Sequence, residues 1–184
     1  EGISITHRSE FISVGTMNPE EGDLRPHLLD RFGLAVEVDG RFFLEERQEV
    51  VKRRIAYEAD PQAFMALWQG SEKEERARVL GSQQLLPNVV VSDDIIELIT
   101  SICAEYDVDG MRGDIVMYKT AATIAAYENR TEVNADDVRE AANLALLNRQ
   151  RRQPFQHPNL ATDQLHYTVN DFQSQHHQRC PLNP

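Results

Sequence analysis

Asn18 is the first residue of this 184-residue chain whose type and position suggest chemistry. It follows an apolar run over residues 11–14, whose aromatic and β-branched residues predict a buried strand. The chain must leave the sheet there, because Pro19 lacks a donor and Gly22 favours turn geometry. Ligands of open α/β sheets bind at the carboxyl ends of strands. The Asn18 amide, which can donate and accept, therefore lies where a phosphate or an attacking water could be held.

Arg31 is the second candidate. Residues 26–30 predict a short helical segment that begins with Pro26 at a favoured first-turn position and leads directly to Arg31. The guanidinium is thus held between structured elements, and its rigid fork of donors suits charge that develops on phosphoryl oxygens. Arg25 lies six residues earlier and is an alternative that spacing alone does not exclude. Taken singly, Asn-Pro turns and Asp-Arg pairs are common and more often structural than functional.

Arg112 is the third candidate. It lies between Gly110 and Gly113, in a turn before a helix predicted over residues 114–128. A cation at a helix N-terminus opposes the macrodipole, so the position costs stability unless an anion offsets it. An isolated Arg in such a turn is more often a solvated side chain than a site.

The stretch GTMNPEEGDLRPHLLDRFGL, which follows the apolar run, closely resembles the ATPase subunits of the magnesium and cobalt chelatases. These form a branch of the AAA+ proteins and drive metal insertion into tetrapyrroles. The resemblance implies that Asn18 is the sensor 1 residue that positions the hydrolytic water. It implies that Arg31 is the arginine finger offered to the neighbouring subunit's nucleotide. Arg112 resembles the family's sensor 2 arginine, which contacts the nucleotide phosphates and couples hydrolysis to lid movement.

No G-x-x-x-x-G-K-[ST] motif occurs in the sequence, because none of the nine glycines is followed by Lys. An apolar strand ending in acidic residues that would hold magnesium is also missing. On the family's plan both motifs lie upstream, so we expect the chain to be the C-terminal portion of the subunit. ATP and Mg²⁺ are the implied cofactors of the full-length parent. We expect this chain alone to bind neither tightly and to be inactive.

The composition limits the class of partner and the cellular compartment that we expect. The chain carries 30 acidic against 19 basic residues, a net charge of −11, which argues against a nucleic-acid partner. The two cysteines, Cys103 and Cys180, do not form a disulfide framework and favour a reducing compartment. No apolar run approaches 18 residues, so we expect no membrane insertion and a cytoplasmic protein. The resemblance implies a homo-oligomeric ring with other chelatase subunits, and the plastid stroma if the source is a photosynthetic eukaryote.

We predict a mainly α fold with a small α/β remnant, in which the end of an AAA+ P-loop core is followed by an α-helical lid bundle. Strands are expected at residues 11–14 and 34–38, and without further partner strands they should remain poorly satisfied. The patterns predict helices over residues 45–58, from Pro61 to about Gly70, from a capping box at Ser71 and Glu74 to Leu86, from Ser92 onward, over 114–128, and from Asn134 onward.

Four regions follow from these patterns. Residues 1–42 are assigned to the end of the core, 43–90 to inserted or connecting helices, 91–152 to the helical lid, and 153–184 to a flexible or docking tail. The tail has one short helix at about 163–172. His176, His177 and Cys180 lack a fourth ligand at standard spacing, so no metal site is predicted.

The expected function is that of part of an AAA+ ATPase that couples ATP hydrolysis to insertion of Mg²⁺ or Co²⁺ into a tetrapyrrole. Two alternatives stay open. The chain could belong to a non-hydrolysing partner subunit, or be a truncated interaction platform of the same complex. It could also come from a related AAA+ ATPase that remodels a protein client.

Overall fold

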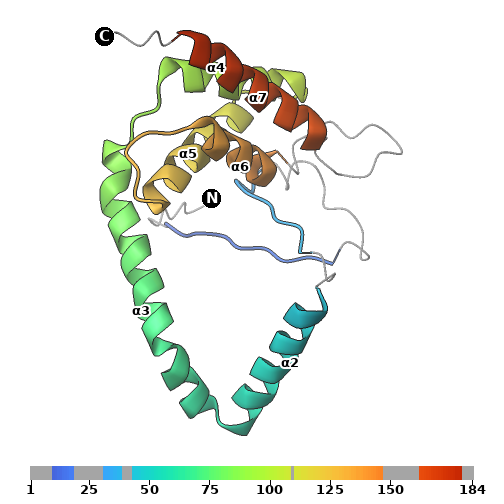
Figure 1. The fold of residues 1–184 in the computed structure, drawn as a ribbon, viewed down its shortest axis with the longest axis vertical. Coiled ribbons are helices and arrows are strands. Elements are labelled where there is room, and N and C mark those ends of the chain that lie inside the picture. The colour runs from blue at the N-terminus through green and yellow to red at the C-terminus, as the bar shows by residue number, and fades with distance from the viewer. Residues whose placement is uncertain (1–9, 19–30, 39–42, 109, 147–161, 180–184) are drawn as a thin grey trace, which may run out of the picture.

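The computed structural model describes residues 10–18, 31–38, 43–108, 110–146 and 162–179. Within them the chain is mainly helical, as predicted. Figure 1 shows α4 to α7 gathered in a bundle, from which α3 and α2 extend as a long arm. The elements in chain order are α2 (Leu44–Ala59), α3 (Pro61–Leu85), the 3₁₀ helix η2 (Leu86–Asn88), α4 (Asp93–Glu105), α5 (Arg112–Tyr127), α6 (Ala135–Ala145) and α7 (Thr162–Arg179).

The bundle is built on α5 and α6, which share the most extensive contact between helices. Small side chains at their interface allow the two helices to pack closely. They include Ala121, Ala125, Ala141 and Ala142, all of which are fully buried or nearly so. An apolar face of α4 is buried against them, through Ile95, Leu98, Ile99, Ile102 and Cys103.

The predicted starts of α4 and α6 are confirmed. The Ser92 hydroxyl accepts a hydrogen bond from the backbone N–H of Ile95 at 3.4 Å and begins α4. At the start of α6, the Asn134 side chain accepts from the backbone N–H of Asp137 at 3.0 Å. The Asp137 carboxylate in turn accepts from the Asn134 N–H at 2.8 Å, which completes a capping box.

The helix α7 is longer than the one expected over residues 163–172. Leu165 and Val169 are fully buried in the bundle core, and the Thr168 hydroxyl donates to the Glu105 carboxylate of α4 at 2.8 Å. The helix contacts both α4 and α6. Three inward positions at helical spacing, completed by the partly buried Phe172, thus fix it to the bundle.

The arm differs from the prediction. A helix end near Gly70 and a new start at Ser71 were expected, but α3 runs unbroken from Pro61 to Leu85. A glycine inside a helix costs only about 1 kcal/mol, which the surrounding good helix formers outweigh. The start of α3 is set by Asp60, whose carboxylate accepts from the backbone N–H groups of Gln62 and Ala63, each at 3.0 Å.

Aromatic contacts hold α2 against α3. The rings of Tyr57 and Phe64 meet edge to face, with their centroids 5.7 Å apart. The Arg53 guanidinium lies over the Trp68 ring, 4.4 Å from its centroid. No residue of α2 or α3 is buried, so these helices form an extended arm rather than part of the core.

The two predicted strands are not formed in the described residues. Residues 10–18 and 31–38 are extended but carry no strand assignment, and the β pairing described is a single parallel bridge between Val90 and Glu132. The strands are not formed because two short segments without further partner strands do not make a stable sheet. Ile12 is 94% exposed and Val38 is 86% exposed. No described helix has the length and apolar character that crossing a membrane would require.

Candidate functional site

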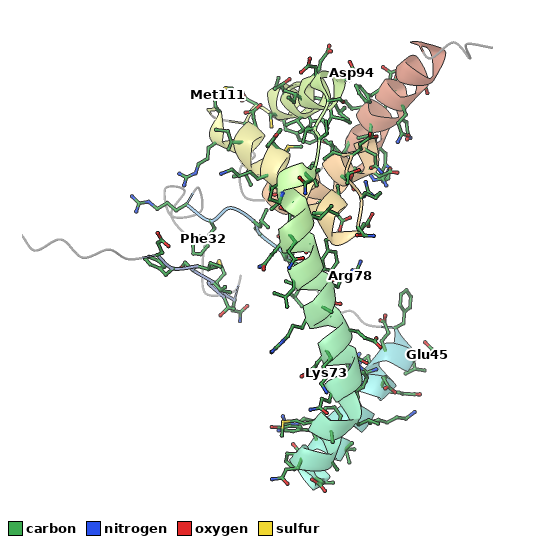
Figure 2. The ribbon with its side chains drawn as sticks, turned by 90° about the vertical axis from the view of Figure 1, so that its left-hand side faces the viewer. Phe32, Glu45, Lys73, Arg78, Asp94 and Met111 are labelled. Carbon is green, nitrogen blue, oxygen red and sulfur yellow. The ribbon has the colours of Figure 1, made fainter. Side chains whose placement is uncertain are left out.

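Asn18 and Arg31 lie on the two extended segments. Asn18 is the last described residue of the first segment and Arg31 the first of the second, and both are exposed. The segments meet where the Phe32 ring lies against Gly15, so closely that a Cβ at Gly15 would be 3.1 Å from the ring. Figure 2 labels Phe32, on the segment that carries Arg31. The close approach of Gly15 and Phe32 therefore brings the two candidate-bearing segments into contact.

The segment that carries Arg31 is also tied to the bundle. The backbone N–H of Ala35 donates to the carbonyl of Leu144, just before the end of α6, at 2.8 Å. Arg25, the alternative to Arg31, lies outside the described residues.

Arg112 is the first residue of α5, so the helix begins two residues earlier than the sequence predicted. The residue is exposed. Asp114 supplies the anion in the first turn that offsets the unfavourable charge. In Figure 2, Met111 and Phe32, the neighbours of Arg112 and Arg31, lie on the same side of α3.

The start of α5 depends on the glycines on either side of Arg112. Gly110 has a φ of +72°, a backbone conformation that other residues adopt at a cost. At Gly113, a Cβ would lie 2.6 Å from Cγ1 of Val108, which is closer than real contacts allow. Gly110 thus has a conformational role in the turn, and Gly113 has a packing role at the start of α5.

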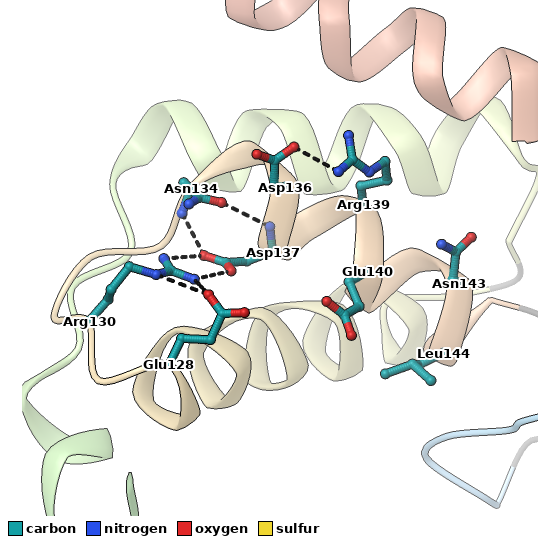
Figure 3. Close-up of a pocket in the computed structure, with 9 residues that line it drawn as sticks. All are labelled: Glu128, Arg130, Asn134, Asp136, Asp137, Arg139, Glu140, Asn143 and Leu144. Atoms are coloured by element: carbon teal, nitrogen blue, oxygen red, sulfur yellow. Dashed lines mark hydrogen bonds and ion pairs between the residues drawn. The ribbon is translucent and has the colours of Figure 1, made fainter. Parts of the chain in front are cut away.

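A polar cluster that sequence reasoning missed lies at the junction of α5 and α6 (Figure 3). The Arg130 guanidinium donates to both carboxylate oxygens of Asp137, at 2.8 Å to Oδ2, and to Glu128 at 2.7 Å. A further N–H donates to the carbonyl of Glu132 at 3.1 Å. The bonds to Asp137 and Glu128 raise the pKa of Arg130. The signal in the sequence was the capping pair Asn134 and Asp137 with an Arg seven residues before the aspartate.

This cluster acts as a clamp rather than as a phosphate receiver. It borders a hollow of about 660 Å³ lined by residues of the α5–α6 junction and α6. Asp137 is only 3% exposed, and its charge and that of Glu128 already neutralise the guanidinium. Among the described residues, no group of three or more His, Cys, Asp or Glu side chains could hold a metal ion. These residues therefore do not fit a resident Mg²⁺ site.

Comparison with known proteins supports the resemblance drawn from the motifs. The family model for the AAA lid domain matches residues 96–166, which span most of α4 through to the start of α7. The magnesium-chelatase subunit ChlI of Synechocystis is 42% identical over 156 residues, or 85% of this chain and 44% of the relative. The magnesium-chelatase subunit ChlI homolog of Methanocaldococcus jannaschii is 45% identical over 175 residues, or 95% of this chain and 48% of the relative.

The chain belongs to the magnesium-chelatase ChlI family of AAA+ proteins. It spans about half the length of these two relatives. A third relative, the uncharacterized protein Rv2850c of Mycobacterium tuberculosis, is 46% identical over 165 residues, which are 90% of this chain and 26% of that protein.

Family membership assigns the bundle of this ChlI-family chain to the AAA lid. It does not test the roles of single residues, so sensor 1 at Asn18, the finger at Arg31 and sensor 2 at Arg112 stay predictions. The boundaries at residues 42, 90 and 152 stay predictions as well. None of Asn18, Arg31 and Arg112 lines either of the two hollows described on the surface.

Proposed function

We propose that this chain is part of an AAA+ ATPase that couples ATP hydrolysis to the insertion of Mg²⁺, or Co²⁺, into a tetrapyrrole. The observation that carries the proposal is the 42% identity to a magnesium-chelatase subunit over 85% of the chain. The exposed positions of Arg31 and Arg112 support it, because a side chain that acts on a nucleotide bound elsewhere must be accessible.

In this proposal each candidate has one task. The Asn18 amide orients the attacking water, for which a neutral group that both donates and accepts is suited. The Arg31 guanidinium reaches the nucleotide of the neighbouring subunit in a ring and stabilises charge on the transferred phosphoryl group. Arg112 contacts the phosphates from the start of α5 and links their state to the position of the lid.

ATP and its Mg²⁺ would be held mainly by residues outside this sequence. The chain has no glycine followed by lysine, and its described residues contain no metal-binding cluster. The purified 184-residue chain should therefore show neither tight ATP binding nor hydrolysis. ATPase activity above a heat-treated blank would contradict this expectation.

A chimaera tests the roles of the arginines. The chain replaces the aligned 156 residues of the Synechocystis subunit, and hydrolysis is compared with the unmodified subunit. Arg31→Ala should reduce turnover by about a thousandfold or more while nucleotide binding is retained. Arg112→Ala should weaken both. Arg54→Ala, which removes an exposed ion pair with Glu58 on α2, is the matched control and should change neither.

Unchanged turnover after Arg31→Ala would refute the finger role of Arg31, and the same change at Arg25 would then show whether the alternative holds. A chimaera that binds nucleotide, assembles and never hydrolyses it would favour the non-hydrolysing subunit or interaction platform. The exposed apolar side chains of the arm, such as Leu67 at 76% and Ile55 at 61%, are the observation that favours this second candidate.

A further inference from the structure

The C-terminal end of α5 is held by the middle of α3. Three residues make the contact, and we name them the clasp: Glu75, Arg78 and Tyr127. The Arg78 Nε donates to the backbone carbonyl of Tyr127 at 3.1 Å, and the guanidinium lies over the Tyr127 ring, 3.8 Å from its centroid. The Tyr127 hydroxyl donates to the Glu75 carboxylate. Figure 2 shows Arg78 part-way along α3, where the arm leaves the bundle.

The clasp satisfies a group that a helix end leaves open. The last carbonyls of an α-helix have no partner within the helix. Here the carbonyls of residues 124–126 accept from the N–H groups of Glu128, Arg130 and Asn129. The Tyr127 carbonyl accepts instead from Arg78 of another helix.

Charge favours the same arrangement. The C-terminus of a helix carries partial negative charge and is stabilised by a nearby cation. The last turn of α5 contains no basic residue of its own. Arg78 supplies the cation from α3, so the arm completes the lid helix electrostatically as well as through its hydrogen bond.

Two rigid elements meet at the clasp. The arm helix α3 is continuous over 25 residues, from Pro61 next to α2 to Leu85 at the bundle. The lid helix α5 has 16 residues and carries Arg112 at the end opposite Tyr127, about 22 Å away at 1.5 Å per residue. A contact that fixes one helix against the other transmits any rotation of the lid to the arm.

We propose that the clasp couples the arm formed by α2 and α3 to the lid, so that the two move as one body and the arm follows α5. The proposal does not depend on the nucleotide role of Arg112, because it concerns the orientation of two helices. The competing explanation is that packing of α3 against α5 and η2 alone sets this orientation.

Distance measurement between two spin labels separates these explanations. One label is placed at Gln62, exposed near the start of α3, and the other at Lys119, exposed on α5. Cys180 is replaced by Ser, and Cys103 is shielded by burial. The otherwise unchanged chain should give a single narrow distance distribution.

The combined change Arg78→Ala and Tyr127→Phe should broaden that distribution, since it removes the stacked guanidinium and both hydrogen bonds of the clasp. Arg76→Ala, on the same helix outside the clasp, is the matched control and should leave the distribution narrow. Far-ultraviolet circular dichroism confirms that each variant retains the helical content. An unchanged distribution in the clasp variant would refute the proposal in favour of packing alone.

A double-mutant cycle gives a second readout. Arg78→Ala and Tyr127→Leu should be non-additive, with a coupling of about two- to fivefold in the unfolding equilibrium constant, as expected for an exposed cation–π contact. Tyr127→Phe keeps the ring and should retain most of that coupling. Additive effects would mean that Arg78 and Tyr127 do not act together, and the clasp would be rejected.

Discussion

Replacing Asp137 should unfold the junction of α5 and α6 more than any nearby surface change. Its carboxylate is almost fully buried. It accepts two bonds from the Arg130 guanidinium and one from the backbone N–H of Asn134. Arg130 also bonds Glu128, and its side chain remains 31% exposed. Asp137→Ala therefore removes the main partner of Arg130 without leaving the guanidinium unpaired.

The size of the effect follows from these contacts. Losing a buried partner of an ion pair costs about 3–5 kcal/mol when the other charge is left unpaired. The exposure of Arg130 and its second partner lower this to about 1.5–2 kcal/mol, near the value for hydrogen bonds to charged groups. Loss of one bond of the capping box adds about 0.5–1 kcal/mol. We expect Asp137→Ala to lower the free energy of unfolding by about 2–3 kcal/mol.

Urea unfolding followed by circular dichroism measures this difference. Asp136→Ala is the matched control, because the neighbouring Asp136 is 56% exposed and pairs with Arg139 at 2.9 Å on the surface. Such pairs contribute about 0–0.5 kcal/mol. Equal losses in the two variants would refute the view that the Arg130 clamp holds α6 on α5.

Three further predictions concern the bundle and the arm. Gly113→Ala should destabilise the chain by about 1–3 kcal/mol through the clash with Val108. Gly70→Ala, with open space around it, should instead stabilise α3 by about 0.5–1 kcal/mol. Thermal melts of both variants show whether the melting temperature falls in the first and rises in the second. Leu165→Ala should lower the free energy of unfolding by about 2–5 kcal/mol and release α7 from the bundle, because Leu165 is fully buried. Limited proteolysis of this variant should then cut at α7 first, and an α7 that resists cleavage would contradict the prediction. Burial raises the pKa of the Tyr106 hydroxyl above its ordinary value of about 10. The folded state therefore holds this proton more tightly than the unfolded state, and the resulting stabilisation is present below about pH 10 and is lost as pH rises through the pKa of the folded state. Ultraviolet titration of native and unfolded protein checks this shift.

The parts of the fold that sequence predicted best are those with a local physical cause. Ser92, Asn134 and Asp60 begin helices because each side chain accepts from the N–H groups that a helix start leaves unpaired. The helix after Ser92 has a local cause as well, since the period of its apolar residues matches that of a helix and these residues reach the core.

The errors arose where two local signals competed or where partners were distant. Ser71 with Glu74 has the pattern of a capping box, but the stronger start at Asp60 and Pro61 lets one helix continue through it. The apolar runs at 11–14 and 34–38 have strand composition, yet a strand needs neighbours that these segments do not have among the described residues.

In the candidate site, too, local patterns were predicted and contacts between distant residues were not. Residue types and order identified the family from Asn18, Arg31 and Arg112, and the comparisons confirmed it. The clamp at Arg130 and the clasp at Tyr127 were not predicted. The clasp joins residues 49 and 52 positions apart, and no local pattern marks such a pairing.

We propose that Arg31 completes the nucleotide site of a neighbouring subunit. Mixing two inactive forms of the Synechocystis chimaera tests this role, one with Arg31→Ala and the other with a replacement of the lysine in the G-x-x-x-x-G-K-[ST] motif that we expect in the relative's half. Random mixing in a ring places an intact site beside an intact Arg31 in about a quarter of the interfaces. We predict that hydrolysis returns to about that fraction of the unmutated chimaera's rate. Mixed rings, verified by native mass spectrometry, that remain inactive would contradict the account.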